Sequence, residues 1–121
     1  MQWWEETVHT LVVMHDWKQQ KKLEAAIRDL VRLAVERMHD CKATLREVVA
    51  VQETFRGKIV WQGAVRVFDL HEHPSASVAY AWSSPVEGTT RRKFYAVLRL
   101  PPVGSPIDAV RASIVGDQKQ V

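Results

Sequence analysis

Hydrophobic positions in the first third of the chain repeat every three or four residues. They form one stripe, made by Leu23, Ala26, Ile27, Leu30, Val31, Ala34, Val35 and Met38. Charged side chains fall on the opposite side, a pattern typical of an amphipathic helix packed on a core. Because Asp16 followed by Gln19 has the spacing of a capping pair, we expect a helix from Trp17 to about His39.

After Cys41 the hydrophobic period changes from helical to two. This alternation, with many Val, Phe, Tyr and Trp residues, predicts strands over residues 45–55, 59–70, 77–83 and 91–100. The connections are short and contain Gly or Pro, so the strands are expected to form an antiparallel meander. Gly63, in the middle of the second of these strands, is expected to mark a bulge that bends the sheet.

A second, short helix is predicted near the C-terminus. Ser105 is placed to cap it, Pro106 suits its first turn, and Asp108 is placed to bind back toward the cap. Gly116 is expected to end this helix.

The first sixteen residues allow two interpretations. Trp4, Val8 and His15 share one helical face with Leu11 and Val12, but β-branched residues between Thr7 and Val13 also suit an edge strand. We prefer a helix that bends near His15.

Together these elements predict a single α+β domain over residues 1–121, in two layers. A long N-terminal helix and a short C-terminal helix would cover one face of a four-stranded antiparallel meander sheet. The hydrophobic content of 46% supports a substantial core. The second and third strands carry large apolar groups on both faces, whereas a sheet covered on one side alternates. We therefore expect a homodimer formed through the second face.

Composition narrows the classes of protein. The chain has 17 basic and 14 acidic side chains, a mild excess that permits nucleic-acid binding without requiring it. The single cysteine, Cys41, excludes an internal disulfide and a multi-cysteine zinc site. Because no signal-peptide pattern and no apolar run of about 20 residues is present, we expect a cytoplasmic protein with no membrane partner.

Metal and nucleophile chemistry are not indicated. Asp69, His71 and His73 would share a face only if the strand continued through them, and Pro74 indicates that it ends. Cys41 lies at the end of the long helix, where the helix dipole disfavours a thiolate. With no phosphate loop, carboxylate pair or nucleophile elbow, we expect no metal, cofactor or catalytic residue, and the pattern favours a non-enzymatic protein.

Two groups of residues are candidates for binding. Trp61 and Trp82 fall on neighbouring strands and could flank one another, since indole rings suit pockets and interfaces as well as cores. The ligand-binding candidates are Trp61, Tyr80, Trp82, His71 and His73. Cations beside aromatic rings also suit single-stranded nucleic acids, and the candidates for that role are Arg66, Arg91, Arg92, Lys93 and Arg99.

The last fifty or so residues resemble a group of known sequences. The resemblance is carried by His73-Pro74, by residues 79–82 (Ala-Tyr-Ala-Trp), by Ala96-Val97-Leu98 and by residues 101–106 (Pro-Pro-Val-Gly-Ser-Pro). This stretch resembles uncharacterised small bacterial α+β proteins of the kind encoded in mobile integron gene cassettes. The resemblance implies a bacterial or environmental origin and supplies no site residue.

The sequence therefore favours a non-enzymatic binding or adaptor module. It is expected to be homodimeric, with a curved sheet that receives a small molecule or a protein partner. The alternatives are a small enzyme with a pocket lined by Trp, Tyr and His, and a nucleic-acid accessory protein that uses the basic strand.

Overall fold

A computed structural model describes the backbone of residues 3–7 and 17–119 and the side chains of residues 21–116. The elements in chain order are β1 (Trp3–Thr7), α1 (Trp17–His39), β2 (Lys42–Phe55), β3 (Lys58–His71), β4 (Val78–Pro85), β5 (Arg91–Leu98) and α2 (Pro106–Lys119). The predicted α+β fold, with a long helix, consecutive antiparallel strands and a short C-terminal helix, is confirmed.

The strands form one antiparallel sheet in the order β1-β5-β4-β3-β2. The predicted meander is present, and β1 adds a fifth strand, in register with β5 from Trp3↔Tyr95 to Thr7↔Arg91. The preferred helix is therefore wrong over residues 3–7, because the open edge of β5 offers backbone hydrogen bonds to an extended segment. The rest of that predicted helix, and the side chains of the capping pair, lie outside the described residues.

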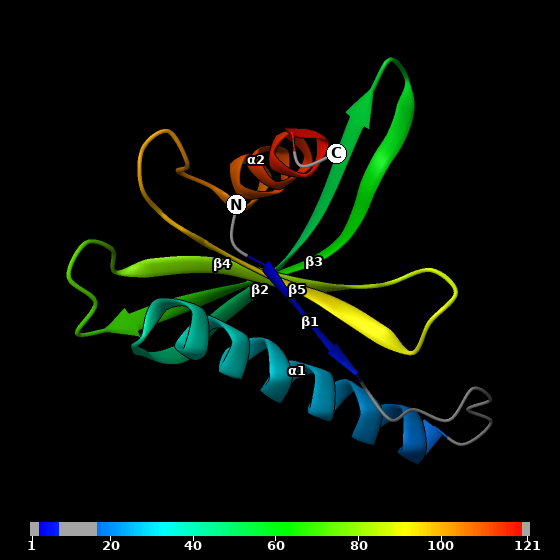
Figure 1. Ribbon diagram of the computed structural model, residues 1–121, viewed down its shortest axis with the longest axis horizontal. Coiled ribbons are helices and arrows are strands. Elements are labelled where there is room, and N and C mark those ends of the chain that lie inside the picture. Colours follow the sequence, from blue (N-terminus) through cyan, green and yellow to red (C-terminus); the bar gives the residue numbers. More distant parts are fainter. Residues whose placement is uncertain (1–2, 8–16, 120–121) are drawn as a thin grey trace.

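The two helices lie on opposite faces of the sheet, which corrects the two-layer prediction (Figure 1). On one face Val31, Ala34 and Val35 of α1 join a core that includes Phe68 and Phe94. On the other face α2 contributes to a second core, which contains Val65, Val67, Tyr80, Trp82, Tyr95, Ala109 and Val110. The apolar groups on both faces of β3 and β4 are thus covered within one chain.

One hairpin extends beyond the body of the sheet (Figure 1). β3 pairs with β4 only from Arg66 to Asp69, whereas its pairing with β2 continues to the turn at Arg56-Gly57. We call the two-stranded part, residues 48–65, the β2–β3 arm. Both turn residues have positive φ, 53° and 78°, as a two-residue hairpin with the twist of the strands requires.

The sheet has irregularities, but Gly63 is not one of them. The register of β2 against β3 shifts between Leu45 and Glu47 and between Glu53 and Thr54, while Gly63 pairs regularly with Val51. The bulge prediction is wrong because this glycine serves packing: a Cβ there would lie 3.0 Å from the ring of Trp61.

The start of α2 follows the sequence prediction. The backbone N–H of Asp108 donates to Ser105 Oγ at 3.3 Å, and the Asp108 carboxylate accepts the N–H of Gly104 at 3.1 Å. The predicted end is wrong, since the helix continues through Gly116 to Lys119.

Candidate functional site

The aromatic candidates lie mainly in the core beneath α2. Trp82 is 1% exposed and stacks on Tyr95, with ring centroids 5.1 Å apart. Trp61 meets Trp82 edge to face at 5.9 Å, so the predicted neighbourhood of these two indoles is confirmed. Tyr80 is 3% exposed in the same cluster. These rings fill space between sheet and helix, which is the ordinary use of buried aromatics.

His71 and His73 lie at the other end of β3, in the connection to β4. Ten residues separate Trp61 from His71, which corresponds to roughly 33 Å of extended chain. His71 Nε2 lies 2.7 Å from Thr44 Oγ1, and His73 Nδ1 accepts the backbone N–H groups of Ser75 and Ala76. The structure therefore does not bring these imidazoles to the tryptophans.

No group of three metal-ligating side chains occurs within the described part of the chain. Asp69 is engaged in an ion pair with Arg46 on the neighbouring strand. His39 packs edge to face with His73, at 6.1 Å between ring centroids, and its Nε2 donates to the carbonyl of Ala96. Burial, followed by the neighbouring His73, lowers the pKa of His39, and the hydrogen bond to Ala96 opposes this shift.

A hollow of about 830 Å³ lies between the end of α1, the start of β2 and the end of β3. Its lining mixes charges of both signs, from Glu36, Arg37, Asp40, Lys42 and Glu72, with the Cys41 thiol. Burial raises the pKa of Cys41, and the carboxylates of Glu36 and Asp40 raise it further. The thiol is therefore protonated at neutral pH, as a structural cysteine is.

The basic candidates on β5 alternate between the two faces of the sheet, so they do not form a continuous row of positive charge. Arg92 shares the α1 face with Phe94, whereas Arg91 and Lys93 belong to the alternate positions. Arg99 follows the end of β5. Of the five predicted residues, the structure brings together Arg66 and Arg92.

These two arginines project from the α1 face of the sheet on either side of Ser83. Arg66 lies opposite Ala81 in the register of β3 and β4, and Ser83 is two residues further along β4 on the same face. Arg92 donates to Ser83 Oγ from Nε at 3.2 Å and from Nη2 at 3.0 Å. Because Arg92 lies opposite Pro85, Ser83 stands between the positions of the two arginines on β4, and Arg92 is the one that binds it.

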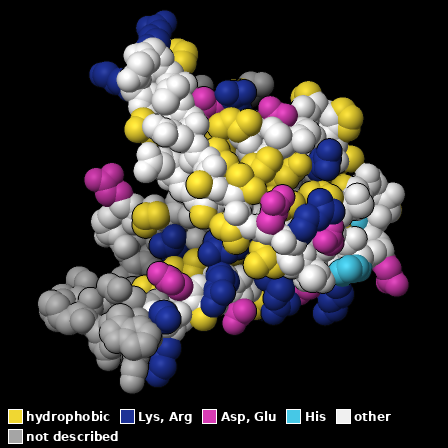
Figure 2. Space-filling view, turned by 180° about the vertical axis from the view of Figure 1, so that it is seen from behind, with side chains coloured by type: hydrophobic (Ala, Val, Ile, Leu, Met, Phe, Trp, Pro, Cys, Tyr) yellow, Lys and Arg dark blue, Asp and Glu magenta, His cyan; other side chains and the backbone are white. Residues whose placement is uncertain are grey.

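A third arginine, Arg28 of α1, acts on the same place and was not among the candidates predicted from the sequence. Burial lowers the pKa of Arg66 most, and the charges of Arg28 and Arg92 lower it further, while Glu24 acts in the opposite direction. Arg66 Nε is buried without a hydrogen-bond partner among the described side chains. We call Arg28, Arg66 and Arg92 the arginine cluster. Figure 2 shows lysine and arginine side chains gathered around α1 on the rear face.

Exposed apolar side chains concentrate on the first hairpin. Among the described side chains, the exposed large hydrophobic groups are Leu45, Val48, Phe55, Ile59, Val60, Leu100 and Val115. The first five belong to β2 or β3. Next to the tip lies a hollow of about 640 Å³, lined by Phe55, Val60, Ile114 and Val115. Scattered exposed hydrophobics are normal, but a group on one edge hairpin indicates an interaction surface.

The edge of β2 carries a regular stretch without charge. Residues 48–52, Val-Val-Ala-Val-Gln, pair continuously with β3 from Val48↔Arg66 to Gln52↔Gln62. A register shift lies on each side, and the nearby charges of Arg46 and Glu53 are paired within the chain, with Asp69 and Arg111. The exposed Glu47 carries a further charge directly before the stretch. No described element covers the outer edge of this strand.

Neither described helix is long and apolar enough to cross a membrane. Comparison with protein-family models, with curated proteins and with solved structures found no match to this chain.

Proposed function

We propose that this chain is a non-enzymatic binding module that works as a homodimer, joined by antiparallel pairing of the β2 edges of two copies. The observation that supports the proposal most directly is the uncharged, proline-free edge stretch of residues 48–52. Edge strands of monomeric proteins are usually protected by charges, prolines or bulges, because their free backbone groups invite another strand. Here the bulges and charges lie beside the stretch and leave its centre open.

The partner is best explained as a second copy. An antiparallel pair of identical strands is two-fold symmetric, so pairing about Ala50 sets Val49 of one copy opposite Val51 of the other with no charge at the centre. At each end Glu47 lies opposite Glu53, whose charge is paired with Arg111. Pairing about Ala50 sets residue 55 of one copy opposite residue 45 of the other. Two exposed side chains, Phe55 at 62% and Leu45 at 42%, then come to lie near one another across the interface. Pairing also stabilises the arm, because an isolated two-stranded ribbon is only marginally stable and the second copy adds further strands at its open edge.

Sedimentation velocity over a range of concentrations tests the proposal. We expect wild-type protein to be dimeric at about tens of micromolar, a range in which specific interfaces are populated. Val48→Lys should give monomers, because it places a charge at a 51% exposed position inside the apolar stretch, opposite Gln52 of the second copy, where no acid is available to pair with it. The matched control is Val115→Lys, which adds the same charge at a 48% exposed valine of α2 and should leave the dimer intact.

Two results would contradict the proposal. A wild-type monomer at these concentrations would mean that the edge remains solvated. A dimer that persists in the Val48→Lys variant would mean that the contact lies elsewhere on the chain.

A further inference from the structure

We propose that the arginine cluster is a binding site for a single phosphoryl group carried by a small ligand. The site lies on the α1 face of the sheet, where Arg66 of β3 and Arg92 of β5 project on either side of Ser83 of β4. Arg28 of α1 adds a third positive charge that acts on Arg66. It is separate from the β2 edge and does not depend on the proposed dimer.

The donors of the cluster are arranged for an external acceptor. Arg66 Nε is buried and has no acceptor, and a buried donor in a native structure usually has one. No hydrogen bond or ion pair of Arg28 or Arg66 to another described side chain is present, so their charges are not neutralised by direct contact. An oxyanion at Arg66 supplies the missing acceptor and the missing negative charge together.

Ser83 adds a directed donor. A hydroxyl group has two acceptor positions and one proton. Arg92 donates two hydrogen bonds to Ser83 Oγ, from Nε and from Nη2, which leaves the hydroxyl proton to donate elsewhere. The same contacts hold the Arg92 fork in place.

The number and geometry of these groups favour a phosphoryl group. Arginine forks match the oxygen spacing of phosphate and carboxylate, and arginine binds both in bidentate fashion. Three guanidinium charges exceed what one carboxylate neutralises, whereas a phosphate monoester carries nearly two negative charges and three acceptor oxygens at neutral pH. Glu24, the acid whose charge acts on Arg66, makes no ion pair with it within the described side chains.

A small ligand fits this placement better than a nucleic-acid strand. A strand requires a row of cations that follows successive phosphates. Arg91 and Lys93 alternate away from Arg92, and Arg99 lies beyond the end of β5. The cluster is therefore one point of positive charge between a helix and a sheet, and it suits one terminal phosphate.

Titration calorimetry with inorganic phosphate tests the site, at constant ionic strength and with chloride as the reference anion. We expect saturable binding to wild-type protein and a loss of about tenfold or more in affinity for Arg66→Gln, which removes the buried donor and one fork. Arg28→Gln, on an exposed helix position, should weaken binding without altering the fold. The control is Arg99→Gln, an exposed arginine outside the cluster with the same change in charge, which should bind as wild type does.

Thermal unfolding gives a second measurement. Phosphate should raise the Tm of wild type and Arg99→Gln above the value in chloride, because a ligand that binds only the folded chain stabilises it. If Arg66→Gln does not fold, Arg28→Gln and Arg92→Gln decide the same question.

Three results would overturn the proposal. Wild-type protein that shows no saturable phosphate binding excludes the site. An equal loss in Arg99→Gln would mean that the effect is general charge attraction. A short single-stranded oligonucleotide without terminal phosphate that binds more tightly than phosphate, with steep salt dependence lost in all the arginine variants, would identify a nucleic-acid backbone as the source of the phosphoryl groups.

Discussion

The ring of Trp61 covers the α-carbon of Gly63, two residues along the same strand. A Cβ at Gly63 would lie 3.0 Å from Cη2 and 3.2 Å from Cζ2 of the indole. The ring in turn packs edge to face on Trp82, which is 1% exposed in the core. The glycine thus lets the arm place an aromatic ring against the body of the protein.

Gly63→Ala should destabilise the protein by about 1–3 kcal/mol, the usual cost of adding a methyl group to a packed site. In a Trp61→Phe background the same substitution should cost less, because the smaller ring lacks the atoms that the methyl group meets. Denaturant unfolding of the four proteins gives the coupling between the two positions. Additive costs would show that the ring does not restrict residue 63.

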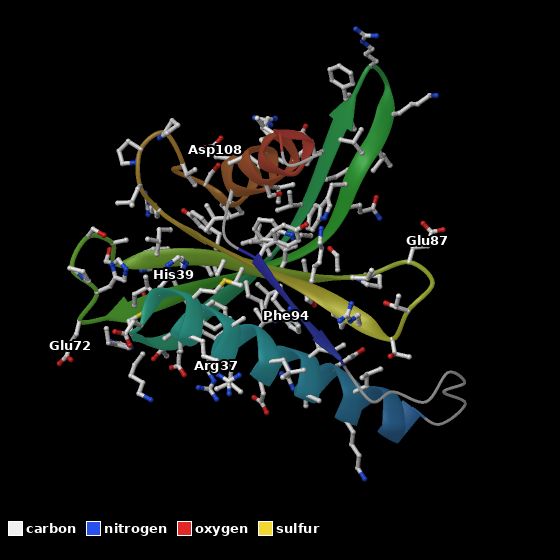
Figure 3. All side chains as sticks on the ribbon, viewed as in Figure 1. Arg37, His39, Glu72, Glu87, Phe94 and Asp108 are labelled. Atoms are coloured by element: carbon white, nitrogen blue, oxygen red, sulfur yellow. The ribbon has the colours of Figure 1, made fainter. Side chains whose placement is uncertain are left out.

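Phe94→Ala should cost about 3–5 kcal/mol of unfolding free energy, since the side chain is fully buried between β5 and α1 (Figure 3). Phe55→Ala removes the same atoms at the 62% exposed arm tip and should change the monomer by about 0.5 kcal/mol or less. Both values are measured by urea unfolding at low protein concentration. Similar costs for the two variants would contradict the assignment of the α1 core.

Cys41 should react slowly with iodoacetamide. Burial raises the pKa of its thiol, and the charges of Glu36 and Asp40 raise it further. The fraction of reactive thiolate at pH 8 is therefore smaller in the folded protein than in the unfolded chain. Asp40→Asn should speed the reaction, by about twofold for loss of an exposed charge. Asparagine tolerates the φ of 49° at this position.

Asp29→Asn is the control for the cysteine experiment, because it removes the same charge twelve residues before Cys41 on the exposed side of α1. It should leave the rate unchanged. A folded protein that reacts as fast as the unfolded chain would show that the thiol is not restrained by its surroundings.

Acid should weaken the fold through His39. Burial lowers its pKa below the ordinary 6.5, and its neutral ring donates to the carbonyl of Ala96. The unfolded chain therefore binds the proton more readily, so this contribution to stability is complete above about pH 6.5 and is lost as the pH falls through the lower folded pKa. Unfolding free energies measured between pH 7.5 and pH 5 should decline less in His39→Gln. An identical pH profile in His39→Gln would show that other groups govern the acid response.

Local interactions were predictable from the sequence. The helix from Trp17 to His39 and the cap formed by Ser105 and Asp108 depend on residues within one or two turns, and the structure has both. The face on which α2 packs was not predictable, because its apolar stripe suits either side of a sheet. Placing it correctly requires the register of all the strands.

The candidate sites show the same division. The meeting of Trp61 and Trp82 follows from neighbouring strands and was predicted. The predicted basic set mixed residues from both faces, because the direction of Arg92 depends on the pairing of β5 with β4. Arg28 belongs to the arginine cluster only because α1 packs on this face of the sheet, and the sequences of the strands do not indicate where the helix packs.

The shift between Leu45 and Glu47 determines where β2 tolerates a change in length. Arg46 is the residue without a partner on β3, and the strict alternation of the sequence is reversed there. Ala43 consequently belongs to the α1 core, whereas Val51, also an odd-numbered residue, belongs to the α2 core. A deletion of Arg46 would leave every other pair of β2 and β3 in register, but a deletion of Val49 would turn one half of the strand over. Homologous chains that are one residue shorter in this strand should therefore lose that residue at the bulge, and not within the regular stretch of residues 48–52.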